Sequence, residues 1–181
     1  VDGLILPFVA GFLPVCIAAT LTLKQRSVYI GYGIIITAGI TAYWYITMTH
    51  GSVGVLVLAV LVIMSDIGGY VFGRLVGGPK FWPSISPKKT WSGTLAGWLL
   101  AATIGMYFSI YFNYMWAVPV AVIVVFGAQL GDIAESWVKR RVGVKDSSGL
   151  IPGHGGLLDR LDGFLGGAII AGLFLNMYRV L

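Results

Sequence analysis

The chain is short of charge and of cysteine. Only 10% of its 181 residues are charged, whereas a typical soluble domain has about 25%, and 57% are hydrophobic. So little polar surface excludes a soluble globular protein, because it could not cover the apolar segments. The one cysteine, Cys16, excludes a disulfide framework and a cysteine-based metal site. No polar, serine-rich or proline-rich linker interrupts the sequence, which favours a single domain over residues 1–181.

The sequence contains several long apolar runs. Crossing about 30 Å of hydrocarbon takes roughly 20 residues, and six segments of this chain are long enough. We therefore expect an all-α, polytopic integral membrane helix bundle with about six transmembrane helices. The expected helices are 3–23, 28–49, 53–76, 93–113, 115–138 and 157–180.

The basic residues are distributed unevenly between the two ends of this bundle. Eleven of the twelve fall in three regions, 24–26, 74–89 and 139–160, which the expected spans place on the same side. The connections on the other side, near 49–52 and 113–115, contain none. The positive-inside rule then predicts the inner (cytoplasmic) membrane, with the charged face in the cytoplasm.

Six of the seven acidic residues lie on the same half, which a purely topological signal would not require. We therefore expect an active site at the cytoplasmic face. The alternative of a non-enzymatic channel or transporter predicts ionised residues in the middle of the spans. Spans one, two and four have none in their interiors, which disfavours that class.

Asp66 begins the first of three charged clusters. Asp66, Tyr70 and Arg74 recur at helical spacing, so they share one helix face. One interpretation is an Asp66–Arg74 ion pair that tethers the end of the span. The other is that Asp66, which lies deeper than a tether needs, lines a polar pocket and contacts a substrate.

The second cluster precedes the expected helix at 93–113. Hydroxyl groups, cations and free backbone N–H groups just before a helix N-terminus are what a phosphate binds. The alternative is a basic membrane anchor with Trp91 at the interface, which leaves the serine and the threonine unexplained. The residues concerned are Ser86, Lys88, Lys89 and Thr90.

The third cluster joins two helix ends. Asp132, Glu135, Ser136 and Lys139 share a helix face, and Asp159 and Asp162 share another at the start of the last span. Mg²⁺ is commonly held by a few carboxylates together with water and substrate phosphates. The alternative is helix-end salt bridging, from Asp159 to Arg160 or Lys139. Between the two helices, His154 stands in a glycine-rich turn, as a proton donor, a phosphate contact or a plain loop residue.

Residues 136–162 resemble the signature of the phosphatidate cytidylyltransferases, also called CDP-diacylglycerol synthases. The stretch reads SWVKRRVGVKDSSGLIPGHGGLLDRLD. Three upstream blocks also resemble this family: 66–74, 86–90 and 131–136. The resemblance covers residues 53–181, which we take as the catalytic core. We expect residues 1–52 to form N-terminal spans outside this core, and we expect the chain to be truncated at its N-terminus.

The resemblance implies transfer of a cytidylyl group from CTP to phosphatidate, which gives CDP-diacylglycerol and pyrophosphate. It implies Mg²⁺ on Asp132 and Asp159, which would then be spatial neighbours, and catalytic roles for these two residues, Lys139 and Arg160. The implied substrate contacts are Asp66, Ser86, Lys88, Lys89, Thr90, Ser136, Arg140, Lys145, Asp146 and His154. One departure is Ser92, where the family pattern has an acid.

The expected partners are CTP, phosphatidate and membrane lipid. We expect no nucleic-acid partner, and a homodimer is left open. The alternative enzyme is a related CTP-dependent transferase that acts on another lipid phosphate, of the archaeol or polyprenyl type.

Overall fold

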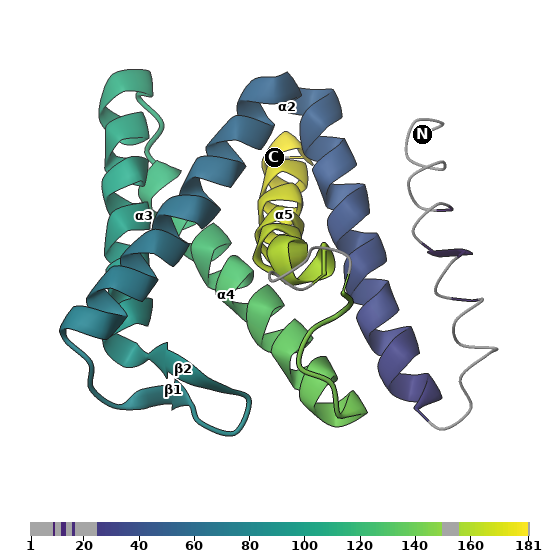
Figure 1. Cartoon of the computed structure of the whole chain (residues 1–181). Helices are drawn as coiled ribbons and strands as arrows, with labels where there is room; N and C mark the ends of the chain where they lie inside the picture. Colours follow the sequence, from purple (N-terminus) through teal and green to yellow (C-terminus); the bar gives the residue numbers. More distant parts are fainter. Residues whose placement is uncertain (1–8, 10–11, 14–15, 17–24, 150–155, 181) are drawn as a thin grey trace.

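The computed structural model of the chain describes residues 25–149 and 156–180, together with positions 9, 12, 13 and 16. Over these residues it consists of four helices and one short hairpin (Figure 1). The elements in order are α2 (Arg26–Leu75), β1 (Lys80–Trp82), β2 (Ser86–Thr90), α3 (Trp91–Phe112), α4 (Ala117–Val142) and α5 (Leu158–Val180).

Helix α2 is bent sharply at Gly51. Its 50 residues would extend about 75 Å if straight, more than twice the hydrocarbon thickness. Gly51 has φ 62° and ψ −156°, a backbone conformation that glycine adopts readily because it has no Cβ. The bend divides α2 into a first arm (26–50) and a second arm (52–75), whose free ends lie at the same end of the molecule (Figure 1).

The expected all-α membrane bundle is confirmed in its coarse form. Among the described residues three helices, α2, α3 and α4, are long and apolar enough to cross a membrane. The expected spans 28–49 and 53–76 are the two arms of α2, and the last three expected spans correspond to α3, α4 and α5. The span at 3–23 lies outside the described residues apart from four positions, so the count of six stays a prediction.

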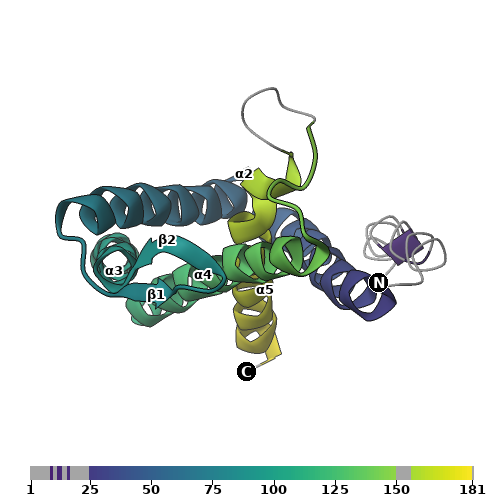
Figure 2. The ribbon, with the colours of Figure 1, turned by 60° about the horizontal axis from the view of Figure 1, so that its bottom comes forward.

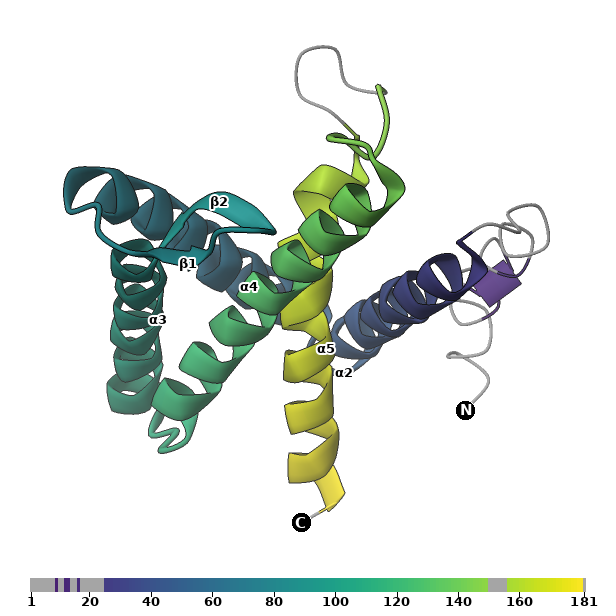
Figure 3. The same cartoon turned by 90° about the horizontal axis from the view of Figure 1, so that it is seen from below.

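The hairpin was not expected from the sequence. Its strands pair antiparallel, with Lys80 opposite Thr90 and Trp82 opposite Ser86. The Phe81 and Trp91 rings pack with centroids 4.6 Å apart, which holds the hairpin against the start of α3. Seen from below, the hairpin lies across the ends of α2 and α3 (Figure 3). All four residues that the sequence analysis assigned to a phosphate-binding helix start therefore belong to strand β2.

Helix α5 lies between the two arms of α2 (Figure 1). An added side-chain carbon at Gly39 of the first arm would meet Leu165, and one at Gly167 would meet Val62 of the second arm. Helix α3 packs beside the second arm and beside α4 (Figure 2). The buried core draws on all four helices; it consists of Ile46, Leu58, Leu61, Val62, Ala101, Ala121, Val124, Val125, Ala128 and Ala168.

Helices α4 and α5 cross at close backbone contact (Figure 3). A Cβ atom on Gly131 would overlap the carbonyl oxygen of Asp162, and one on Gly166 would overlap that of Gly127. Small residues permit this approach between membrane helices, where packing rather than the hydrophobic effect drives association. The crossing lies one residue from Asp132 on α4 and includes Asp162 on α5, so it sets how the acids of the two helices face each other.

We predict that Gly131→Ala destabilises the protein by roughly 1–3 kcal/mol, because the added methyl group forces the two backbones apart. Thermal unfolding of the detergent-purified protein measures this. Gly31→Ala is the matched control, since an added Cβ there meets nothing within 4 Å. Equal melting temperatures for the two variants would show that the crossing tolerates a larger separation.

Candidate active site

The start of α3 positions the basic residues of the hairpin. The Thr90 hydroxyl accepts a hydrogen bond from the Gly93 N–H (3.2 Å) and so caps the helix, as threonine commonly does. Ser92 donates to the carbonyl oxygen of Gly77 (2.5 Å), which ties the helix start to the segment before β1. Lys88 and Lys89 immediately precede this capped end, so the cap fixes the position of the backbone that carries them.

A polar cleft opens between the second arm of α2, the hairpin, and helices α3 and α4. Its volume is about 500 Å³, within the usual range of small-molecule sites. Both charge signs line it, so it suits an anionic ligand that carries or recruits a cation. Its polar lining consists of Ser65, Asp66, Tyr70, Arg74, Lys80, Lys88, Lys89, Thr90, Thr94, Gln129 and Asp132.

An ion pair between Lys89 and Asp132 crosses the polar cleft from β2 to α4. Both side chains keep about a third of their surface exposed (27% and 35%), so each is available to a ligand. Ser136, one turn along α4, lies at 3.4 Å from the other Asp132 oxygen. Asp132 therefore belongs both to the polar cleft and to the acids that follow it.

Four carboxylates gather where α4 meets α5, and we call Asp132, Glu135, Asp159 and Asp162 the acidic cluster. Asp162 lies close enough to Asp132 and to Glu135 to interact electrostatically with both. Lys139 lies inside the cluster, with its Nζ at 2.6 Å from Glu135 and at 2.6 Å from Asp159. Glu135 is only 1% exposed, so this lysine supplies the positive charge that a buried carboxylate needs.

Asp159 organises the connection between α4 and α5. Its Oδ2 accepts hydrogen bonds from the backbone N–H of Ser147 (2.9 Å), the Ser147 hydroxyl (2.9 Å) and the N–H of Gly156 (2.7 Å). Its Oδ1 faces Lys139. An acid in the first turn also interacts favourably with the helix dipole. Asp159 thus joins the start of α5, the loop and Lys139.

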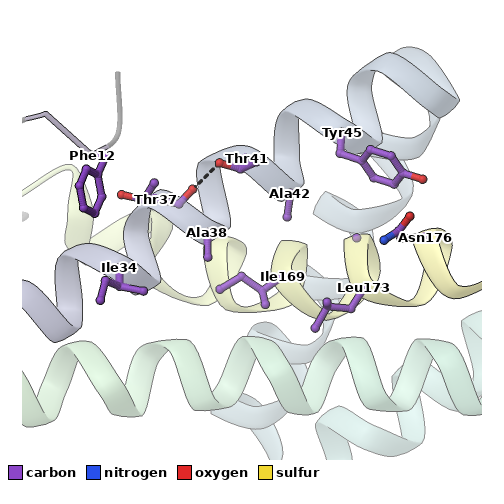
Figure 4. Close-up of a pocket in the computed structure, with 11 residues that line it drawn as sticks. Phe12, Ile34, Thr37, Ala38, Thr41, Ala42, Tyr45, Ile169, Leu173 and Asn176 are labelled. Atoms are coloured by element: carbon purple, nitrogen blue, oxygen red, sulfur yellow. Dashed lines mark hydrogen bonds between the residues drawn. The ribbon is translucent and has the colours of Figure 1, made fainter. Parts of the chain in front are cut away.

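A second hollow, away from the polar cleft, is apolar in character. This groove, of about 480 Å³, lies between the first arm of α2 and α5, lined by residues such as Ile34, Ala38 and Leu173 (Figure 4). The Thr37 hydroxyl donates to the carbonyl oxygen of Gly33 (2.9 Å), and the Thr41 hydroxyl donates to that of Thr37 (2.8 Å). A groove without ionised side chains suits hydrocarbon rather than a nucleotide, so the chemistry belongs to the polar cleft.

Comparison with known sequences assigns the family. The sequence model of the family described as "Cytidylyltransferase family" matches residues 4–178. The chain belongs to this family.

Curated relatives carry one name. A phosphatidate cytidylyltransferase of Brucella melitensis is 45% identical over 127 residues, which are 68% of this chain and 47% of that protein. One of Staphylococcus haemolyticus is 42% identical over 142 residues, 76% of this chain and 52% of that protein. The chain thus spans about half the length of the curated relatives it matches.

A solved structure of an intramembrane enzyme for archaeal membrane lipid biosynthesis also aligns with the chain. It covers 67% of this chain and 91% of its own, at 23% identity and a TM-score of 0.43. A likeness at this level is no evidence of a shared substrate.

The structure sorts the residues predicted for the cytidylyltransferase site into three groups. Asp66, Lys88, Lys89, Thr90 and Asp132 line the polar cleft, although the Thr90 hydroxyl is engaged in the helix cap. Ser136, Lys139 and Asp159 belong to or adjoin the acidic cluster. Outside both, Ser86 is half-buried at the start of β2, and four further side chains are exposed: Arg140, Lys145, Asp146 and Arg160. His154 lies outside the described residues.

The structure also distinguishes between the ion pairs that the sequence left open for Asp66 and Asp159. Arg74 donates to the Tyr70 hydroxyl (3.3 Å), and no ion pair between described residues involves Asp66, so the tether interpretation is not what the structure shows. Salt bridging of Asp159 to Lys139, in contrast, is present. Lys139 thus pairs with Asp159 as well as with Glu135. Asp132 and Asp162 make no ion pair with this lysine.

Several residues that line the polar cleft or belong to the acidic cluster were not among the predicted site residues. Glu135 was placed on one helix face with Asp132 and Lys139, but it was given no role of its own. Gln129 is a lone amide in an apolar helix and lines the polar cleft. Tyr32, on the first arm of α2, lies within electrostatic reach of all four acids of the cluster, which belong to α4 and α5. No local pattern in the sequence predicts this proximity between distant segments.

The acidic cluster has the donor chemistry of a Mg²⁺ site. Glu135 Oε1 is buried and accepts no hydrogen bond from a described residue, and a cation would satisfy it. Asp132 has one oxygen with only a long contact to Ser136, whereas both Asp159 oxygens already receive donors. No group of three or more acids, histidines or cysteines among the described residues encloses a metal by itself, so water and phosphate oxygens would have to complete the shell. The pairing of Asp132 with Asp159 on one ion stays a prediction.

We predict that Lys139→Met destabilises the protein by about 3–5 kcal/mol, because it leaves the buried Glu135 and the neighbouring Asp159 without their counter-charge. Denaturant titration of the purified protein measures the loss. Lys145→Met removes an exposed lysine of the same length and should change stability by less than about 0.5 kcal/mol. Similar small losses in both variants would mean that solvent, not Lys139, neutralises the cluster.

Proposed function

We propose that this chain carries the catalytic part of a phosphatidate cytidylyltransferase, which transfers a cytidylyl group from CTP to phosphatidate. The observation that carries this proposal is the polar cleft, where cationic side chains and Asp132 meet inside a membrane-helix bundle. Membership of the cytidylyltransferase family and the names of the curated relatives support it. A channel is disfavoured, because the charges line a pocket at one end of the bundle.

The reaction needs little acid–base chemistry from the protein. A phosphate monoester has a second pKa of about 6, so the lipid phosphate reaches the site largely as a dianion. One of its oxygens forms a bond to the α-phosphorus of CTP, the bond from that phosphorus to the bridging oxygen breaks, and pyrophosphate leaves with the electron pair. The protein has to align two anions that repel each other and offset their charge.

The residues of the polar cleft can supply this alignment. Lys88 and Lys89 would hold nucleotide or lipid phosphate, with Arg74 and Lys80 at the same end of the cleft. Once a phosphate takes over Lys89, Asp132 is released from its ion pair and free to bind a cation. Mg²⁺, held by Asp132 with Glu135 or Asp162, or with Asp159 as the sequence predicted, would polarise the α-phosphate and neutralise the leaving group. Lys139 would keep the acidic cluster together instead of contacting phosphate.

We also propose that the protein lies in the cytoplasmic membrane with the polar cleft open to the cytoplasm. The free ends of both α2 arms, the hairpin and the end of α4 lie at one end of the molecule, and their sequences carry most of the basic residues (Figure 1). The positive-inside rule assigns that end to the cytoplasm, where CTP is available. The acyl chains would remain in the bilayer beside the apolar groove.

We predict that Asp132→Asn lowers turnover of CTP with phosphatidate by roughly 10²-fold or more, because asparagine keeps the shape but loses the charge that a cation requires. Production of CDP-diacylglycerol by the purified protein is the measurement. Ser109→Ala, about four turns further along α3 than the cleft-lining Thr94, serves as control and should retain wild-type turnover. Near-full activity of Asp132→Asn would remove Asp132 from the mechanism.

A further inference from the structure

The inner end of the polar cleft lies well below its basic mouth. Asp66 precedes Arg74 by eight residues on the second arm of α2, which places it about 12 Å further in along the helix. Gln129 on α4 lies at this depth, because an added Cβ at Gly97 would meet both its Nε2 and the carbonyl oxygen of Ser65, at 3.2 Å each. Thr94 on α3 also lines the cleft. Arg74, Lys80 and Lys88 come from the end of α2 and from the hairpin, and Lys89 reaches inward only as far as Asp132, with which it pairs. The inner end is therefore left to a different part of the ligand.

Few polar groups at the inner end remain available to a ligand. The Ser65 hydroxyl donates to the carbonyl oxygen of Val62 (2.9 Å), and the Thr94 hydroxyl donates to that of Thr90 (3.1 Å). Asp66 takes part in no ion pair between described residues. The carboxylate of Asp66 and the amide of Gln129 are therefore the groups that can meet a ligand here.

Trp98 fixes the orientation of the Gln129 amide. The indole N–H of Trp98 donates to Gln129 Oε1 at 2.9 Å. An indole nitrogen can only donate, so the amide oxygen must face Trp98 and the NH₂ group must face away from it. The inner end thus offers an acceptor-only group, Asp66, together with an oriented donor, Gln129.

We propose that this pair binds the cytosine base of the nucleotide, an inference that rests on the proposed function. Cytosine presents an exocyclic amino donor at N4 beside acceptors at N3 and O2. The Asp66 carboxylate would accept from the N4 amino group, as acidic side chains do when they recognise cytosine, and the Gln129 NH₂ group would donate to N3 or O2. Trp98 is a positioning residue that acts through Gln129.

The same geometry rejects uracil. Uracil has a carbonyl oxygen in place of the N4 amino group, so two acceptors would face each other at Asp66. A site with a polar group left unpaired by the wrong ligand discriminates strongly, because the desolvated group is not satisfied. The base would lie at the inner end, and the triphosphate would extend past Asp132 to Lys88 and Lys89, in one continuous cleft.

The test compares kcat/KM for CTP and for UTP in the purified full chain and its variants. Wild type should prefer CTP, and Asp66→Asn should reduce the CTP-to-UTP ratio by about tenfold or more, because asparagine can donate to the uracil oxygen. Gln129→Leu should raise KM for CTP with little change in kcat, as expected for a lost binding contact. Trp98→Phe should shift KM in the same direction. Thr103→Val, five residues further along α3, should change neither parameter.

If a variant does not turn over, thermal stabilisation by CTP against UTP reports the same preference. A CTP-to-UTP ratio that is unchanged in Asp66→Asn, by turnover or by stabilisation, overturns base recognition while wild-type activity upholds the proposed function. A wild-type protein that neither uses CTP nor is stabilised by it overturns the proposed function and this inference together.

Discussion

The close packing of α4 against α5 is the constraint on which the rest of the site depends. Gly131 and Gly166 let the two backbones touch, and the contact brings Asp132 and Glu135 of one helix against Asp159 and Asp162 of the other. Like charges this close to hydrocarbon are unfavourable unless they are neutralised. Lys139 inside the cluster and Lys89 from the hairpin provide that neutralisation. The cluster contains four carboxylates and these two lysines, so a bound cation, or a proton shared between Glu135 and Asp162, would complete its neutralisation.

The bend of α2 provides the second half of the site. Because Gly51 reverses the helix, its second arm returns to the charged end and contributes Asp66 and Arg74 to the polar cleft. The hairpin that follows lies across the ends of α2 and α3 (Figure 3), and its Lys88 and Lys89 line the same cleft. In the proposed arrangement Lys88 and Lys89 meet the phosphates of the nucleotide, Asp132 lies between, and Asp66 with the oriented amide of Gln129 meets the base.

Much of this arrangement could be predicted from the sequence, because charge in an apolar chain stands out. The clusters around Lys89, Asp132 and Asp159 were found from their composition and helical spacing, and the helix boundaries followed from the lengths of the apolar runs. The hairpin was missed because strands of three and five residues that carry Lys and Pro have no clear alternation. Tyr32 and Gln129 were missed because their roles depend on helix packing across long sequence separations. The engagement of Thr90 in a helix cap likewise depends on where α3 begins.

The central claim is that this chain transfers the cytidylyl group, and the fate of the CTP phosphates tests it most directly. The purified protein would be incubated with phosphatidate, Mg²⁺ and CTP labelled at either the α- or the γ-phosphate, and the lipid phase would be counted. The account predicts that the α-label enters the lipid phase, while the γ-label stays in the aqueous phase as pyrophosphate. A parallel incubation with CTP labelled in its cytosine should bring the same molar amount of label into the lipid. Transfer of the γ-label into lipid, or no α-label in lipid at all, would contradict it.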